Sequence, residues 1–283
     1  MATFYNQAVL SYNGNNTTSN ITTGEIVQVL SATKTAVTEE YSSGDTITYV
    51  VNIINSGATA FTGLTLTDNL GAYAFDALTL VPITYTAGSL RYFENGVLRP
   101  TPVITDESPL TVTGLSVPAG GNTTLVYEVS TNGFAPLEAG SVITNQAVIS
   151  GVNISPITAE ETITVESAPS LTISKSLSPA TVTENGRLTY TFVIQNTGNT
   201  PAAATDNVVV TDTFTPALSG ITVTAGGETW TEGVNYTYNE TTGLFATIAG
   251  QLTVPAATYT RDPATGAVII NPGVTVLTVT GTI

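Results

Sequence analysis

Short stretches in which apolar and polar residues alternate recur along the chain, each ended by a cluster of Gly, Asn, Asp or Pro. Alternation with a period of two predicts β-strands with one buried face, and the clusters predict the turns between them. This number and spacing of short strands is typical of an immunoglobulin-like β-sandwich. From Leu30 onward the predicted strands are Leu30–Val37, Thr46–Asn55, Thr62–Asp68, Leu90–Phe93 with Val97–Leu98, Leu110–Leu115, Thr123–Val129, Ile143–Ser150 and Glu161–Val165.

The pattern then starts again with similar residues at a constant separation. Leu30-Ser-Ala-Thr-Lys34 corresponds to Leu171-Thr-Ile-Ser-Lys175, and Thr48–Gly57 corresponds to Thr189–Gly198, each 141 positions later. Self-similarity at a fixed separation indicates tandem copies of one structural unit. The sequence therefore predicts a two-domain repeat.

The repeat divides the chain into three parts. We expect a complete domain over residues 29–166, a second domain over 167–283, and a separate N-terminal segment over 1–28. A chain of 283 residues is long enough for two domains, each with its own core. The expected fold class is all-β, with two tandem immunoglobulin-like β-sandwich domains after an N-terminal donor-strand segment.

The two domains differ in their last strands. Val274–Thr280 aligns with Thr123–Val129, so the second domain lacks a counterpart of the closing strand Ile143–Ser150. A matching strand stands instead at Phe4–Ser11, in front of the first domain. An unclosed sandwich exposes its core and unpaired backbone groups. A strand added by another molecule would satisfy both.

We therefore expect residues 1–28 of one copy to complete the second domain of the next copy. This segment is predicted to hold two strands, Phe4–Ser11 and Glu25–Val29, joined by a flexible loop around Tyr12–Asn20. A head-to-tail contact that does not close on itself gives an open filament. The alternative is that the chain is a piece of a longer repeat protein. The donor side chains expected to enter the neighbour's core are Phe4, Ala8 and Leu10.

Composition narrows the chemistry further. The chain contains no Cys and no His, which excludes disulfides, thiol nucleophiles, His-based triads and His/Cys zinc sites. A formal charge of −15 argues against binding to nucleic acid or to an anionic membrane face. No apolar run is long enough to span a bilayer, and no secretory signal is recognised at the N-terminus. No cofactor or metal is expected.

Polar residues of three kinds alternate in step with apolar residues along their strands, so they are expected on the buried face. The only two lysines, Lys34 and Lys175, occupy the same aligned position, and the alternation points both inward. Asp68 and Asp212 follow the same rule after a three-residue insertion between the repeats. The third kind is asparagine, at Asn145 in the first domain's closing strand and at Asn6 in the matching N-terminal strand.

Burying an unpaired ammonium or carboxylate is costly, so such groups pair, become neutral or react. One interpretation is a structural Lys–Asp pair, with the Asn capping a strand edge. The other is a spontaneous isopeptide bond, in which a neutral lysine attacks the Asn side-chain amide. The protonated Asp would polarise the carbonyl and transfer protons as ammonia leaves. This would be a single-turnover autocatalytic step, and no enzyme activity with turnover is expected.

These residues also carry a resemblance. The Leu-x-x-x-Lys opening, Tyr-x-x-x-Ile-x-Asn-x-Gly, Thr-Asp and Thr-Asn-Gln-Ala resemble the "conserved repeat domain" family of immunoglobulin-like bacterial surface proteins, which is similar to the isopeptide-forming domains of Gram-positive pilins and adhesins. The resemblance implies an extracellular place, on the cell surface. Because no export signal is recognised, deposition on a spore surface by a lysing mother cell is the second expectation. The resemblance also implies a Lys34–Asn145 bond with Asp68 as catalyst. The second domain offers Lys175 and Asp212 without an Asn, so we expect Asn6 of another copy to supply it.

A second function class is an adhesin or stalk module that binds a ligand through its loops. The pairs Glu39-Glu40 and Glu160-Glu161 fit solvated turns better than calcium sites. Two insertion-rich regions, Gly71–Asp106 and Ser219–Asp262, hold aromatic residues that either form such a surface or pack under the loops. They are Tyr73, Phe75, Tyr85, Tyr92, Phe93, Trp230, Tyr236 and Tyr238.

Overall fold

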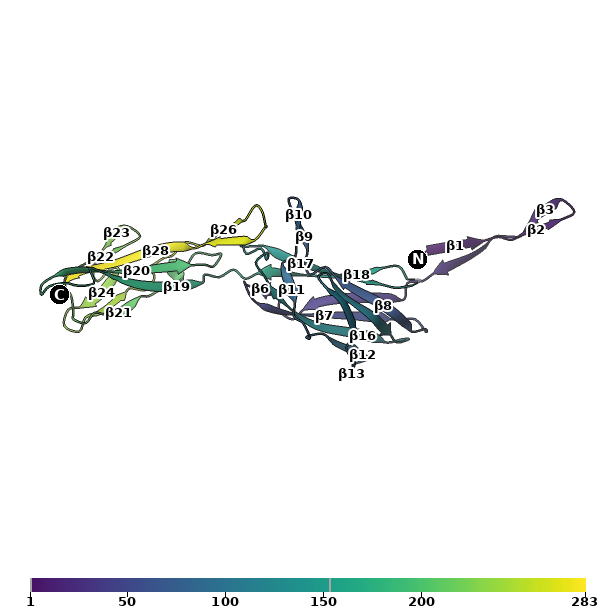
Figure 1. The fold of residues 1–283 in the computed structure, drawn as a ribbon, viewed down its shortest axis with the longest axis horizontal. Helices are drawn as coiled ribbons and strands as arrows, with labels where there is room; N and C mark the ends of the chain where they lie inside the picture. Colours follow the sequence, from purple (N-terminus) through teal and green to yellow (C-terminus); the bar gives the residue numbers. More distant parts are fainter. Residues whose placement is uncertain (1, 153) are drawn as a thin grey trace.

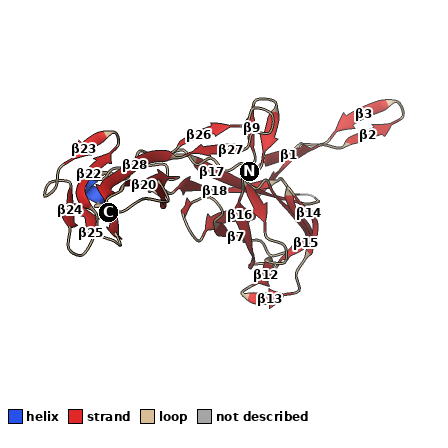
Figure 2. Cartoon of the chain, turned by 60° about the vertical axis from the view of Figure 1, so that its left-hand side comes forward, coloured by secondary structure: helices blue, strands red, loops and turns tan. Residues whose placement is uncertain are grey.

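The computed structural model describes residues 2–152 and 154–283 and shows an elongated, almost entirely β molecule (Figure 1). A long N-terminal hairpin projects at one end, and two sheet-rich bodies follow one another toward the C-terminus. Figure 2 shows strands joined by loops, and in the described residues the one helix is the single turn η1 (Ala204–Asp206). None of the described helices is long and apolar enough to cross a membrane. The expected all-β class is confirmed.

The first domain packs two sheets around one core. The first sheet has the order β13 (Val97–Arg99), β12 (Arg91–Glu94), β16 (Asn122–Thr131), β7 (Thr46–Asn55) and β5 (Leu30–Ala36), with β11 (Ile83–Tyr85) also on β16. The second has the order β14 (Val103–Glu107), β15 (Leu110–Val117), β8 (Phe61–Asp68), β17 (Val142–Ser150), β18 (Ile157–Val165) and β6 (Glu40–Tyr41). Burial alternates along β7, β16 and β17, because one face of each strand meets the opposite sheet.

The second domain repeats this plan with fewer strands. One sheet has the order β19 (Leu171–Ser178), β20 (Arg187–Asn196), β28 (Gly273–Thr282), β22 (Ser219–Ala225) and β23 (Glu228–Trp230). The other has three strands, β21 (Thr211–Thr213), β25 (Leu244–Thr247) and β24 (Tyr236–Asn239). Its core is separate from that of the first domain and includes Leu188, Phe192, Phe214, Phe245 and Leu277.

The strands β17 and β18 account for the difference between the domains. In the first domain β8 is paired on both sides, with β15 and with β17, and β18 extends the sheet and lies against β5. In the second domain β21, the counterpart of β8, pairs only with β25 among the described strands. Every residue of β19, the counterpart of β5, is exposed. One edge and one face of the second sandwich are therefore open.

The N-terminal segment is a long hairpin rather than two strands and a loop. Strands β1 (Ala2–Asn6) and β4 (Thr22–Ile26) pair at its base, and β2 (Val9–Tyr12) and β3 (Asn15–Thr18) pair at its tip. The stretch expected to be a loop folds because Asn13-Gly14 adopts positive φ at both positions, which is the two-residue turn that suits a hairpin. The expected strand Phe4–Ser11 is interrupted at Gln7-Ala8.

Two inserted hairpins, one from each domain, meet between the domains. They are β9–β10 (Tyr73–Phe75 and Leu78–Leu80) in the first domain and β26–β27 (Thr258–Arg261 and Val268–Asn271) in the second. Arg261 donates a hydrogen bond of 2.7 Å to the Tyr73 hydroxyl. Its guanidinium lies 5.4 Å and 5.5 Å from the ring centroids of Tyr73 and Phe75.

Apolar and backbone contacts complete this junction. Tyr259, Val268 and Ile270 of the second domain pack against the core of the first domain. The backbone N–H of Val268 donates to the Gly133 carbonyl at 2.8 Å. We call this contact between the β9–β10 and β26–β27 hairpins the strut. It fixes the orientation of one domain relative to the other.

Replacing Arg261 by Ala is expected to loosen the strut, because the Tyr73 hydroxyl loses its cationic donor and the rings of Tyr73 and Phe75 both lose their contact with the guanidinium. The chain has no Cys, so spin labels at Glu107→Cys and Glu240→Cys report the interdomain distance alone when labelled protein is diluted with unlabelled protein. Arg261→Ala should broaden the distance distribution. Arg99→Ala, which removes an exposed arginine paired with Glu94, should leave it unchanged. Equal widths for both variants would contradict the strut.

Candidate functional site

The candidate site in the first domain lies between its two sheets. Lys34 extends from β5 in one sheet, and Asp68 and Asn145 extend from β8 and β17 in the other. The Lys34 ammonium nitrogen and a carboxylate oxygen of Asp68 are 2.5 Å apart, and both side chains are fully buried. Asn145 is also fully buried. The structure therefore brings all three predicted residues of this domain into its core.

Strand register explains why these residues meet. Ala147 of β17 lies opposite Asp68 of β8, so Asn145, two residues earlier on the same face, stands just beyond Asp68. Lys34 of β5 lies opposite Val51 of β7 and reaches across the core from the other sheet. A covalent bond between Lys34 and Asn145 would therefore join the two sheets of the sandwich.

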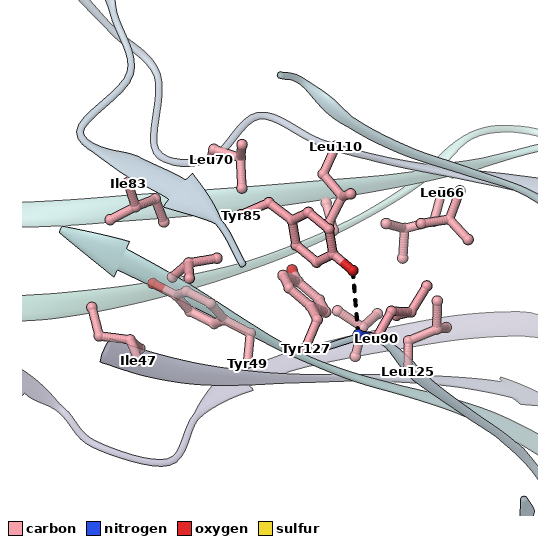
Figure 3. Packing of buried hydrophobic residues seen from close by; sticks show 14 of the residues in the cluster. Ile47, Tyr49, Leu66, Leu70, Ile83, Tyr85, Leu90, Leu110, Leu125 and Tyr127 are labelled. Carbon is pink, nitrogen blue, oxygen red and sulfur yellow. Dashed lines mark hydrogen bonds between the residues drawn. The ribbon is translucent and has the colours of Figure 1, made fainter. Parts of the chain in front are cut away.

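Two tyrosines complete the polar group. Tyr127 of β16 donates its hydroxyl hydrogen to the same oxygen of Asp68 that binds Lys34. Tyr49 of β7 lies beside Lys34, whose ammonium nitrogen is 4.7 Å from the Tyr49 ring centroid. Figure 3 shows Tyr49, Tyr127 and Tyr85 together among the apolar side chains of the core. Tyr49 and Tyr127 were not predicted as site residues from the sequence, although Tyr49 recurs in the repeat as Tyr190.

The surroundings favour the neutral form of the lysine. Burial lowers the pKa of Lys34 to about 8, against the opposing charge of Asp68. Burial raises the pKa of Tyr127 well above its usual value, and the charge of Asp68 adds to that effect. Tyr127 is therefore a hydrogen-bond donor at neutral pH, and a fraction of Lys34 is uncharged.

The Asn145 carboxamide is held by only one of its two ends. Its oxygen accepts a hydrogen bond of 3.2 Å from the backbone N–H of Gly71. Its nitrogen has no hydrogen-bond partner among the described residues, and neither has the neighbouring Tyr49 hydroxyl. Such buried unpaired groups cost about 1–3 kcal/mol each. Loss of the nitrogen as ammonia would remove one of these costs.

The second domain holds an incomplete copy of this arrangement. Lys175 and Asp212 form an ion pair whose side chains are 40% and 19% exposed, whereas the equivalent pair in the first domain is fully buried. The Lys175 ammonium nitrogen is 4.5 Å from the ring centroid of Tyr190, which stacks on Phe214. Lys175 thus faces the core of its domain but is not covered.

The uncovered region has a definite composition. We call it the open face: the free edge of β21 with Asp212, and the exposed strand β19 with Lys175 and the apolar side chains of Leu171, Ile173 and Leu177. In the first domain the equivalent surface is covered by β17 and β18. The open face therefore lacks two strands and one asparagine among the described residues.

The predicted donor residues lie on the projecting hairpin, far from the open face of the same chain (Figure 1). Asn6, Ala8, Phe4 and Leu10 are all exposed, and Phe4 and Leu10 are 53% and 62% exposed. The hairpin exposes further large apolar side chains, at Tyr5, Val9, Tyr12 and Ile21. In a single chain the structure does not bring Asn6 together with Lys175.

The loop aromatics are mostly used inside the protein. Tyr85, Tyr92 and Tyr236 are buried, and Trp230 and Tyr238 pack against the second core. Tyr73 and Phe75 hold Arg261 in the strut. Among the described residues, no group of Asp and Glu side chains is arranged to hold a metal ion.

No protein-family model matches the sequence, and no curated protein matches it. Among solved structures, the chain is similar to BcpA, the major pilin subunit of Bacillus cereus, with a TM-score of 0.36 and 12% identity over 96% of this chain and 73% of that one. It is similar to the pilus backbone protein RrgB of Streptococcus pneumoniae, with a TM-score of 0.35 and 10% identity over 86% of this chain. The chain spans 55% of the RrgB chain. A further similar structure is BslA, a bacterial hydrophobin, with a TM-score of 0.31 and 14% identity over 51% of this chain and 100% of that one.

Proposed function

We propose that the protein is the structural subunit of an extracellular filament on a cell or spore surface. Subunits join head to tail when the N-terminal hairpin of one copy enters the open face of the next. The observation that carries this proposal is that one chain has two complementary surfaces, each with exposed apolar side chains or an unpaired strand edge. A hairpin with exposed apolar side chains projects at one end, and a sandwich with an open edge and face stands at the other.

The hairpin matches the strands that close the first domain. In that domain β17 and β18 pair antiparallel with Asn145 opposite Glu161, and in the hairpin β1 and β4 pair antiparallel with Asn6 opposite Thr22. Asn6-Gln7-Ala8-Val9 repeats Asn145-Gln146-Ala147-Val148. The base of the hairpin therefore pairs as the closing strands of the first domain do, and the rest of the match requires the hairpin to straighten at Gln7-Ala8.

The register of the first domain predicts the register of the joint. Ala147 lies opposite Asp68, so Ala8 is expected opposite Asp212, which places Asn6 beside Lys175. Leu10 and Phe4 then follow on the inward face. For docking, β1 and β2 must become one continuous strand across Gln7-Ala8. At present the Ala8 backbone N–H donates a hydrogen bond of 3.0 Å to the Ser19 hydroxyl oxygen. Pairing with the edge of β21 would replace that contact.

We further propose that each joint becomes covalent, and that the first domain carries its own internal bond. The neutral amine of Lys34 attacks the side-chain carbonyl carbon of Asn145, the Lys–Asn C–N bond forms, and the original C–N bond breaks. One proton passes from the lysine nitrogen through Asp68 to the departing nitrogen, which leaves as ammonia. Lys175, Asp212 and Asn6 of the entering copy would react in the same way once the hairpin covers the open face.

The second candidate function is an adhesin or stalk module cut from a longer repeat protein. In that case the residues that close the second domain follow it in its own chain, and the exposed loops bind a ligand. Negative-stain microscopy separates the two candidates. Filaments of the purified chain, replaced by single particles when residues 2–12 are deleted, support the subunit. Particles in both samples favour the module.

The internal bond is expected to lower the intact mass of an Asn6→Ala chain, in which no joint can become covalent, by about 17 Da for one lost ammonia. The same chain with Asn145→Ala or Lys34→Arg should keep its full calculated mass, because one partner of the bond is missing. Intact-mass spectrometry under denaturing conditions makes the measurement. An unshifted mass in the Asn6→Ala chain would disprove the internal bond.

The covalent joint is expected to survive denaturation. Purified protein boiled in SDS should run as a ladder of multimers, because amide bonds between copies are not broken by detergent or heat. Asn6→Ala or Lys175→Ala should reduce the ladder to a monomer band. Asn20→Ala, which changes another exposed asparagine of the same hairpin, is the matched control and should keep the ladder. A single monomer band in the unmodified protein excludes covalent joints.

Formation of the internal bond should depend on pH through the charge of Lys34. The starting sample is a chain that has never folded and is kept in denaturant, so that the bond has not formed. When it is refolded at different pH values, the rate of ammonia loss should rise by about tenfold per pH unit below the lysine pKa and stay constant above it. The pKa of Lys34, lowered by burial, places the bend near pH 8, because only the unprotonated amine attacks. Intact mass against time at each pH gives the rate. A flat profile from pH 5 to 9 would contradict the neutral-amine step.

A further inference from the structure

The Tyr49 hydroxyl has no assigned role, although it is a polar group buried at the site of the proposed bond. Tyr49 is 0% exposed, and its hydroxyl finds no hydrogen-bond partner among the described residues. The adjacent Asn145 nitrogen is unpaired as well. Two neighbouring unpaired groups in an otherwise well-satisfied core indicate an interaction that is not yet made in this state.

The Asn145 side chain lies near enough to the Tyr49 hydroxyl to lower its pKa, but the two groups do not have the geometry of a hydrogen bond. Burial and the charge of Asp68 raise the pKa of Tyr49, and the Asn145 amide acts in the opposite direction. Tyr49 therefore remains protonated at neutral pH, with its O–H available as a donor. Tyr127 occupies a different position, since its hydroxyl is bound to Asp68.

The chemistry of the amide nitrogen explains why this donor is unused. In a carboxamide the nitrogen lone pair is delocalised into the carbonyl, so the nitrogen donates hydrogen bonds but does not accept them. When Lys34 adds to the carbonyl carbon, the carbon becomes tetrahedral and the nitrogen becomes an amine with a free lone pair. At that moment it becomes an acceptor, and the Tyr49 O–H lies beside it.

We propose that Tyr49 is a catalytic residue of bond formation in the first domain, and that its hydroxyl donates a hydrogen bond to the departing nitrogen of Asn145 once Lys34 has added. This inference rests on the proposed function. The Gly71 N–H, which already holds the Asn145 oxygen at 3.2 Å, stabilises the negative charge on that oxygen in the same adduct. An interaction made only after addition lowers the barrier without stabilising the starting amide.

The proton balance of the reaction is unchanged by this role. The lysine nitrogen loses one proton to Asp68, and Asp68 returns it to the departing nitrogen, so ammonia leaves and Asp68 regains its starting state. Before this transfer the Tyr49 O–H binds the one lone pair of the nitrogen and orients it. When the proton from Asp68 takes that lone pair, the hydrogen bond is released, an N–H of the departing group donates to the Tyr49 oxygen instead, and Tyr49 keeps its own proton.

The test compares refolding reactions of the full-length chain with Asn6→Ala, so that only the internal bond forms. Tyr49→Phe keeps the ring and removes the hydroxyl, and it should slow ammonia loss by on the order of 100-fold. Tyr85→Phe is the matched control: Tyr85 is another buried tyrosine of this core, but its hydroxyl accepts from the Leu90 N–H, as Figure 3 shows, and its loss should leave the rate unchanged.

A purely structural role for Tyr49 predicts a different result. In an Asn145→Ala background, where no bond can form, Tyr49→Phe should not lower the urea midpoint of unfolding, because the hydroxyl it removes is unpaired. A lower midpoint together with an unchanged reaction rate would overturn the proposal. If Tyr49→Phe does not refold, 3-fluorotyrosine at position 49 keeps the hydroxyl and makes it a stronger donor, and the rate should rise by about twofold or more.

The outcomes also separate this inference from the proposed function. Equal rates for Tyr49→Phe and the parent chain overturn the role of Tyr49 while leaving the bond itself established. No ammonia loss in the parent chain overturns both.

Discussion

The buried ion pair of Lys34 and Asp68 is the constraint on which the first domain depends. Two opposite charges removed from water are tolerable only when every neighbouring group is placed to satisfy them. Tyr127 binds the carboxylate from one side, and β17 and β18 seal the pair from solvent. In the second domain, where the described residues of the chain form no counterpart of these two strands, the equivalent Lys175–Asp212 pair is exposed to solvent. Closure of the sandwich thus decides whether this ion pair is buried in the core or exposed to water.

The repeat made much of this fold predictable. Alternation placed β7 at its observed bounds and most other strands of the first domain within a few residues, because each strand buries one face. The short inserted hairpins were not predicted. Their strands are three to four residues long in β9, β10, β26 and β27, too short for a period to show. Some of the partners that stabilise them, such as Arg261 for Tyr73, lie in the other domain.

The candidate site was predicted in part, for physical reasons that can be named. Lys34, Asp68 and Asn145 stood out because charged and amide residues occupied apolar phase in their strands. Tyr49 and Gly71 did not stand out. A tyrosine on the buried face of a strand is common, and a backbone N–H that donates to a side chain leaves no pattern in the sequence. Gly71 has φ of +69°, and a Cβ there would lie 2.6 Å from Ile143, so a glycine is needed to bring its N–H to Asn145.

The N-terminal turn at Asn13-Gly14 did have a sequence signal, because this dipeptide favours two-residue hairpin turns.

The strut has a consequence for the mechanics of any assembly of these subunits. It exists at the junction within a chain, where an inserted hairpin from each domain meets the other. The joint between chains would use the N-terminal hairpin and the open face of the second domain, and the strands that the structure describes include no such pair of inserted hairpins there. A filament built in this way would be a line of stiff rods, each two domains long, linked by more compliant hinges. Its bending would be confined to every second junction, so it would be stiffer than a chain hinged between all of its domains.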